Sequence, residues 1–214
     1  MKLCLAAAAI LWLGAASSFA HRLDEYLQGT IVSVEKNQLH AQVMLTPGVA
    51  VFSDLFADID TNSDGTISPE EQRAYALRFL SEVSLAIDGH LLSPRLLAYR
   101  FPETGEMKEG RGEIQLEFDA DLPPGGPNRK LTFENHHESR ISVYQVNCLA
   151  PRDPDIRIVA QNRNYLQSHY ELDYVQGAVS VNWLASVWLG ASKWLGTGAL
   201  ILLGWLMLLR RQRA

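Results

Sequence analysis

The stretch YLQGTIVSVEKNQLHAQVMLT, residues 26–46, decides the fold class. Apolar and polar side chains alternate along residues 26–35 and again along residues 38–46, which is the period of a β-strand with one buried face. The polar residues Lys36 and Asn37 separate the two runs. The stretch therefore predicts a β-hairpin.

Outward from this hairpin, further strand-like runs follow along the chain. They cover residues 83–87, 96–100, 113–119, 130–134, 141–147, 156–160 and 170–174. Asp88-Gly89 predicts a tight turn, and the Pro- and Gly-rich residues 123–127 separate two of the runs. Short strands at this spacing predict a mostly β fold, an antiparallel β-sandwich.

Helical spacing replaces the alternation in residues 49–82, after the break at Pro47-Gly48. The apolar face of a first helix consists of Val51, Phe52, Leu55, Phe56 and Ile59. The apolar residues of a second helix, which Pro69 can begin, are Tyr75, Leu77, Phe79, Leu80 and Val83. We therefore expect a helix-loop-helix inserted after the second strand.

The loop between these helices, residues 60–71, reads DTNSDGTISPEE and fits D-x-[DN]-x-[DN]-G-x5-E at every constrained position. Calcium takes about six to eight oxygen ligands, which a short loop must wrap around it. Gly65 permits the sharp turn that a Cβ would hinder. The predicted metal ligands are side-chain oxygens of Asp60, Asn62 and Asp64, the backbone carbonyl of Thr66, Ser68 directly or through water, and both carboxylate oxygens of Glu71.

Residues about 49–83 resemble the EF-hand calcium-binding family, and the resemblance implies Ca2+ binding through these six residues. EF-hands usually work in pairs, and the sequence holds no second loop of this pattern. Ile67, at loop position 8, would normally pair with a partner loop. Either the hand docks on the sandwich, or two chains pair their hands as a homodimer. A lone site with three acidic ligands predicts weak binding, with a Kd on the order of 10⁻⁴–10⁻³ M, so a structural role competes with a sensor role.

The two ends of the chain differ from this middle. Residues 1–20 carry Lys2, an apolar run and small residues before Ala20, which predicts a cleaved signal peptide. Residues 194–209 are uncharged and precede an arginine-rich tail, residues 210–214. Extended back to Val187, they predict a transmembrane helix over residues 187–209 with a cytoplasmic tail. The alternatives are an uncleaved N-terminal anchor, a buried C-terminal helix and a C-terminal sorting tail.

The sequence thus predicts a single-pass cell-membrane protein whose domain, residues 21–182, lies in the periplasm or at the cell surface. Residues 21–192 hold all 24 acidic residues and 14 of the 19 basic ones, so their formal charge is 14 − 24 = −10. Such a domain suits cations and disfavours nucleic acid as a partner. Cleavage leaves Cys148 alone, so no intramolecular disulfide can form. No enzyme signature is present, and we expect no catalytic activity.

The mature N-terminus offers an alternative function. Cleavage after Ala20 would expose His21, whose amine and imidazole chelate Cu(II) well. Further ligands that the sequence offers by residue type are His136, His137, His169, Glu134 and Glu138. An accessory protein that handles Cu, Ni or Co through His21 is therefore one alternative, and a structural, membrane-tethered interaction domain is another.

A looser resemblance covers most of the mature chain. The segments HRLDEYLQ (21–28), TPGVAV (46–51) and VYQVN (143–147) are similar to the exported N-terminal region of HupE/UreJ-like bacterial membrane proteins. That resemblance implies an association with nickel or cobalt transport and with hydrogenase or urease accessory roles. The chain departs from the family in having one terminal helix and no multi-helix transporter body. It therefore supports at most a stand-alone or accessory version of the exported domain.

Overall fold

The alternating stretch 26–46 forms the hairpin at the centre of the fold. In the computed structural model, which describes residues 24–177, β1 (Tyr26–Val34) pairs antiparallel with β2 (Gln38–Pro47). Every second side chain of β1 is buried, beginning with Tyr26, and so is every second side chain of β2, beginning with Leu39. The period of two therefore turns one face of the hairpin toward the core.

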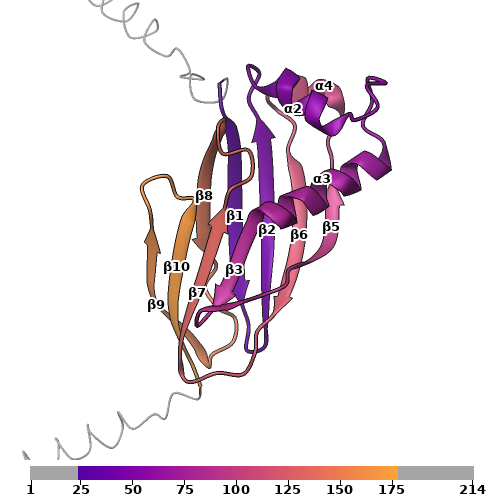
Figure 1. Ribbon diagram of the computed structural model, residues 1–214. Coiled ribbons are helices and arrows are strands. Elements are labelled where there is room, and N and C mark those ends of the chain that lie inside the picture. The colour runs from indigo at the N-terminus through magenta and orange to yellow at the C-terminus, as the bar shows by residue number, and fades with distance from the viewer. Residues whose placement is uncertain (1–23, 178–214) are drawn as a thin grey trace, which may run out of the picture. The chain divides into compact units, whose positions relative to one another are not determined.

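The described residues form ten strands in two five-stranded sheets (Figure 1). The first sheet has the order β5-β6-β2-β1-β8 and the second the order β4-β3-β7-β10-β9. The other strands are β3 (Val83–Ile87), β4 (His90–Leu91), β5 (Arg95–Arg100), β6 (Ile114–Asp121), β7 (Asn128–Asn135), β8 (Ser142–Cys148), β9 (Ile156–Arg163) and β10 (His169–Gln176). The helices are α2 (Phe52–Ile59), α3 (Pro69–Glu82) and α4 (Thr104–Lys108).

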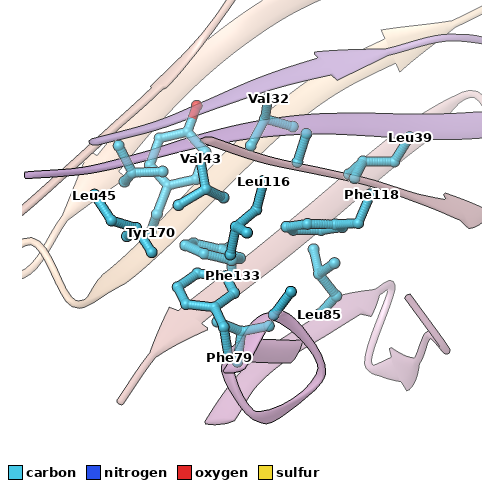
Figure 2. Close-up of a cluster of buried hydrophobic side chains, with 14 of the residues drawn as sticks. Val32, Leu39, Val43, Leu45, Phe79, Leu85, Leu116, Phe118, Phe133 and Tyr170 are labelled. Atoms are coloured by element: carbon cyan, nitrogen blue, oxygen red, sulfur yellow. The ribbon is translucent and has the colours of Figure 1, made fainter. Parts of the chain in front are cut away.

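The inward faces of the two sheets meet in one hydrophobic core, part of which Figure 2 shows. Val43 and Leu116 come from the first sheet, Leu85 and Phe133 come from the second, and Phe79 comes from α3. Each of these side chains is at most 2% exposed. The predicted mostly β fold with two facing sheets is therefore confirmed.

One strand pair departs from the predicted antiparallel sandwich. β8 runs parallel to β1, from the pair Tyr26–Ser142 to the pair Val32–Cys148, whereas the other seven strand pairs of the described chain are antiparallel. The chain leaves β7 in the second sheet and crosses to the first sheet through residues 136–141. It enters β8 beside the start of β1, so the two strands share a direction.

All nine predicted strands are present, and two short elements, β4 and α4, were not predicted. β4 follows the predicted tight turn, in which Asp88 has φ 52° and Gly89 has φ 82°. α4 lies in the connection from β5 to β6 and buries Met107 completely. Gly112 closes that connection tightly, because a Cβ there would lie 2.7 Å from the backbone nitrogen of Met107.

The predicted helical insertion is present as α2, a loop and α3. α2 buries Phe52, Leu55 and Ile59, whereas α3 buries Glu71, Tyr75, Ala76 and Phe79. In Figure 1, α3 lies across the first sheet and leads directly into β3 of the second sheet, and it contacts both β5 and β3. The insertion therefore contributes to the core of the sandwich.

The compact unit of the described chain ends at Gly177. The predicted signal peptide (1–20), His21, the predicted transmembrane helix (187–209) and the tail (210–214) lie outside the described residues. Between Asp24 and Gly177, no helix is long and apolar enough to cross a membrane.

Candidate functional site

The backbone of residues 60–71 turns sharply between α2 and α3. Asp60 is the C-cap of α2 and Ser68 is the N-cap of α3. Gly65 has φ +84°, in the left-handed region that glycine adopts at little cost. No atom lies within 4 Å of the position that a Cβ would take there. The requirement for glycine at this position is therefore conformational.

The carboxylate of Asp60 holds the middle of the loop. Its Oδ1 accepts a hydrogen bond from the backbone N–H of Asp64 at 3.1 Å, and its Oδ2 accepts one from the N–H of Gly65 at 2.8 Å. The Asp60 side chain lies inside the turn, and the residue is only 4% exposed. The first predicted ligand thus faces inward, as the motif requires.

The middle ligand positions form a second, exposed set of hydrogen bonds. Asn62 Oδ1 accepts from the N–H of Asp64 at 2.9 Å. Asp64 Oδ1 accepts from the N–H of Thr66 at 2.8 Å and from its hydroxyl at 2.7 Å. The hydrogen bonds from Thr66, with a further one from Asn62, lower the pKa of Asp64. Asp64 is therefore ionised at neutral pH.

Glu71 closes the loop and caps α3. Its Oε2 accepts from the N–H of Ser68 at 3.0 Å, and its own N–H donates to Ser68 Oγ at 3.3 Å, which together form a capping box. Oε2 also accepts from the Ser68 hydroxyl at 2.9 Å. Its Oε1 accepts from the N–H of Thr61 at 2.8 Å. The hydrogen bonds from Ser68 and then Thr61 lower the pKa of Glu71 to about 2. Glu71 is 6% exposed, so this carboxylate is both charged and nearly buried.

The three carboxylates of the loop do not converge on one point. Across residues 24–177, no three His, Cys, Asp or Glu side chains are grouped so that they could hold a metal ion. Asp60, Asp64 and Glu71 each accept hydrogen bonds from N–H and O–H groups of the loop instead. No described Lys, Arg or His forms an ion pair with any of them. The predicted ligand residues thus share one loop, but its negative charge has no cationic partner there.

The side chain of Ile67 bears on a question that the sequence leaves open. Ile67 is partly buried and packs against the hydrophobic core of its own chain. Its backbone carbonyl accepts a hydrogen bond from Gln72 Nε2 at 3.3 Å. Within its own chain, Ile67 is therefore partly covered by the hydrophobic core, and pairing with a second chain stays a prediction.

A buried polar cluster around His137 ties α3 to the sandwich, and the sequence did not predict it. His137 is fully buried in the connection between β7 and β8. Its Nε2 lies 2.8 Å from the hydroxyl of Tyr75, which lies 2.5 Å from the hydroxyl of Tyr26. Its Nδ1 lies 2.5 Å from Glu82 Oε2. The carboxylate assigns the N–H to Nδ1, so Nε2 accepts from Tyr75.

The backbone of His137 is bound as tightly as its ring. Its carbonyl accepts from Gln28 Nε2 and from the Tyr144 hydroxyl, both at 2.9 Å. Its N–H donates to Asn135 Oδ1 at 2.9 Å, and Asn135 Nδ2 donates to Gln28 Oε1. Burial lowers the pKa of His137, although Glu82 opposes that shift. His137 joins α3 through its buried imidazole and β1 and β8 through its backbone carbonyl, so its role is structural.

The sequence did contain one signal for this cluster. Gln28 occupies an inward position of the alternating strand β1 and is fully buried. A polar side chain at an inward position needs buried hydrogen-bond partners. The sequence alone does not show which distant residues provide them.

The other predicted metal ligands are separated by the fold. His137 is buried, and Glu138 pairs with Arg78 at 3.3 Å. His136 and His169 both contact the carboxylate of Glu134, at 3.2 Å and 3.0 Å. These two contacts lower the pKa of Glu134. Only three of the five candidates therefore lie together, on the surface where β7 ends and β10 begins.

Comparison of the chain with protein-family models, curated proteins and solved structures found no match. The similarities to EF-hands and to HupE/UreJ-like proteins stay predictions from short sequence motifs. A functional assignment must therefore rest on the chemistry of the site.

Proposed function

We propose that residues 60–71 bind a calcium ion and that calcium orders the helix-loop-helix of a membrane-anchored, extracytoplasmic protein. One observation carries the proposal: Asp60 and Glu71 are 4% and 6% exposed, and neither has a cationic partner among the described residues. Only neutral N–H and O–H groups stabilise these carboxylates, so the negative charge of the loop has no counter-ion. Glu71, with a pKa of about 2, keeps its charge at neutral pH. A bound cation would neutralise that charge.

The donor set of the loop fits calcium in particular. The six predicted ligands supply only oxygen atoms, which hard cations prefer, and include no imidazole or thiolate of the kind that selects transition metals. An ionised carboxylate has about four lone-pair sites, so Asp60, which accepts two N–H groups, still has capacity for a metal. Glu71 accepts from Thr61, Asn62 and Ser68 on both of its oxygens, so it would exchange some of these hydrogen bonds for the ion. Calcium tolerates irregular geometry, whereas Mg2+ demands a near-ideal octahedron. A loop with an all-oxygen donor set and no octahedral arrangement therefore favours calcium.

Calcium would stabilise the junction between the two helices. The loop begins at the C-cap of α2 and ends in the first turn of α3, so an ion held by Asp60 and Glu71 would connect the two helices. The only ion pair between these helices in the described chain joins Arg78 and Asp58 at 3.6 Å. With a Kd on the order of 10⁻³ M, roughly 10 mM calcium would stabilise the folded state by about 1.4 kcal/mol.

Thermal unfolding of the full-length protein with and without calcium tests this proposal. We expect calcium at roughly 10 mM to raise Tm by a few degrees and magnesium to raise it less. Asp60→Asn and Glu71→Gln should each abolish the calcium-dependent part of the shift, whatever they do to Tm without calcium. Glu70→Gln is the matched control, because Glu70 is an exposed neighbour in the same helical turn. A wild-type Tm that calcium does not change would contradict the proposal.

The remaining parts of the proposal concern residues outside the described chain. Export rests on residues 1–20 and anchoring on residues 187–209, and protease protection of the tail in intact cells would test the orientation. A protein partner of the hand, or a second copy of this chain, belongs to the same proposal. The alternative of transition-metal handling depends on His21. Calcium is better supported, because Asp60 and Glu71 have no cationic partner among the described residues, whereas His136 and His169 already share the carboxylate of Glu134.

A further inference from the structure

A cleft of about 670 Å³ lies on the outer face of the first sheet. Three side chains that line it, Leu27, Thr46 and Val143, form one row across three strands. Leu27 of β1 is paired with Val143 of β8 on one side and with Thr46 of β2 on the other. The volume falls within the roughly 300–1,000 Å³ that small-ligand sites occupy. The row forms the floor of the cleft.

A tightly held turn after α4 forms one wall of this cleft, through Gly110, Arg111 and Glu113. The N–H of Gly110 donates to Met107 O at 3.0 Å, and the N–H of Arg111 donates to Glu106 O at 3.0 Å. Met107 anchors this turn, because its side chain is fully buried. The wall is therefore preformed, which lowers the entropic cost of binding a ligand.

Two of the three floor residues, Leu27 and Val143, are apolar, although the floor faces away from the core. Leu27 is 43% exposed and Val143 is 39% exposed, and the two are direct neighbours across the β1–β8 pair. Apolar side chains that are paired at the bottom of a cleft offer a ligand a surface that loses water on binding. The cleft therefore favours a ligand with an aliphatic or aromatic body.

The rim of the cleft carries unbalanced negative charge. Glu25 and Glu113 both line it, and neither forms an ion pair within residues 24–177. The only cationic side chain in the lining, Arg111, is already paired with Glu109. Two carboxylates beside an apolar floor attract a cation and disfavour an anion.

We propose that this cleft binds an organic cation with an apolar body, such as a primary amine or a guanidinium joined to an aliphatic or aromatic group. The cation would lie at Glu25 and Glu113, and the apolar body would cover Leu27 and Val143. A small amine or a lysine or arginine side chain of a peptide could supply this chemistry. No residue of the 60–71 loop lines the cleft, so the two proposed sites share no residue.

Calorimetric titration of the full-length protein tests the proposal with defined probes. 4-Phenylbutylamine represents a small amine, acetyl-Phe-Lys-Leu-amide represents a peptide, and 4-phenylbutanoate is the anion of similar shape. We expect at least one cationic probe to bind saturably and 4-phenylbutanoate to bind at least tenfold more weakly (an order-of-magnitude figure). Which cation binds more tightly identifies the source of the ligand. Added salt should weaken binding, since the rim is exposed.

Two substitutions and a matched control locate the binding site. Glu25→Gln and Glu113→Gln should each weaken the binding of the cationic probe by roughly threefold to tenfold, since each removes one charge without changing the shape. Glu117→Gln should leave the affinity for the cationic probe unchanged. Glu117 lies in β6, the strand that follows Glu113, but it does not line the cleft. Equal weakening by all three variants, or no saturable binding of either cation up to about 10 mM, would overturn the proposal.

Discussion

The 60–71 loop and the His137 cluster are both polar, and both depend on α3, but they are built in opposite ways. In the loop, hydrogen-bonding partners lie two to ten residues apart in the sequence. In the cluster, five of the seven hydrogen bonds described above join residues 49 to 109 apart, from several elements of the fold. The loop satisfies its polar groups locally, whereas the cluster satisfies them only when the sandwich is complete.

The difference shows how α3 can serve two purposes. Glu71 and Tyr75 are four residues apart and therefore share one face of the helix, and both are buried. Glu71 faces the loop, whose negative charge has no cationic partner among the described residues. Tyr75 faces the cluster, in which both ring nitrogens of His137 and the hydroxyls of Tyr26 and Tyr75 have hydrogen-bond partners. We therefore expect substitutions in the cluster to destabilise the whole fold, and substitutions in the loop to act mainly on the loop and on calcium binding.

The largest effect should come from His137→Ala. The substitution removes the acceptor of Tyr75 and the donor to Glu82, and it leaves a cavity at a fully buried position. Those losses together should lower the free energy of unfolding by about 3 kcal/mol or more. Urea unfolding of the full-length protein measures the change, and His136→Ala, at the exposed neighbour, serves as the control. Similar stabilities of the two variants would contradict the structural role of the cluster.

Tyr75→Phe should have a smaller effect, because the ring is retained. The aromatic ring still packs edge-on against Phe101 and His137, but the hydroxyl of Tyr26 and Nε2 of His137 lose the Tyr75 hydroxyl as their shared partner. We expect a loss of about 1–3 kcal/mol. Tyr165→Phe is the matched control, since Tyr165 is 99% exposed and should cost almost nothing. Equal stability of wild type and Tyr75→Phe would mean that the hydrogen bonds of the Tyr75 hydroxyl make no net contribution to the free energy of unfolding.

Acid should weaken the cluster through His137. Burial lowers the pKa of His137 below the ordinary 6.5, so the unfolded chain binds this proton at a higher pH than the folded protein does. The stabilisation is complete above pH 6.5 and declines as the pH falls below it, by up to about 1.4 kcal/mol per pH unit for one proton. Denaturant midpoints between pH 7 and about 5.5 test this in wild type. The same slope in His137→Gln would show that another group is responsible.

The sequence predicted what depends on short-range patterns. Alternation predicted β1 and β2, and the ligand spacing located Asp60, Gly65 and Glu71 in a turn between two helices. The sequence could not show that β8 pairs parallel to β1, because alternation carries no information on which strands are neighbours. The same limit explains why the sequence grouped His136 and His137 as possible metal ligands although the fold separates their side chains. His136 and His137 are adjacent in the chain, but one is exposed and the other is fully buried.

The smallest effect should come from Gly65→Ala, which tests whether the loop is energetically separate. Alanine at φ +84° should cost about 1 kcal/mol, and no neighbouring atom lies within 4 Å to add a clash. Gly126→Ala is the matched control, because the site is equally open but its φ is not in the left-handed region. Because the cost is confined to the loop, calcium-dependent stabilisation should fall in Gly65→Ala while the acid slope assigned to His137 stays as in wild type. A changed acid slope would show instead that α3 transmits strain from the loop to the buried cluster, so that the two regions act as one unit.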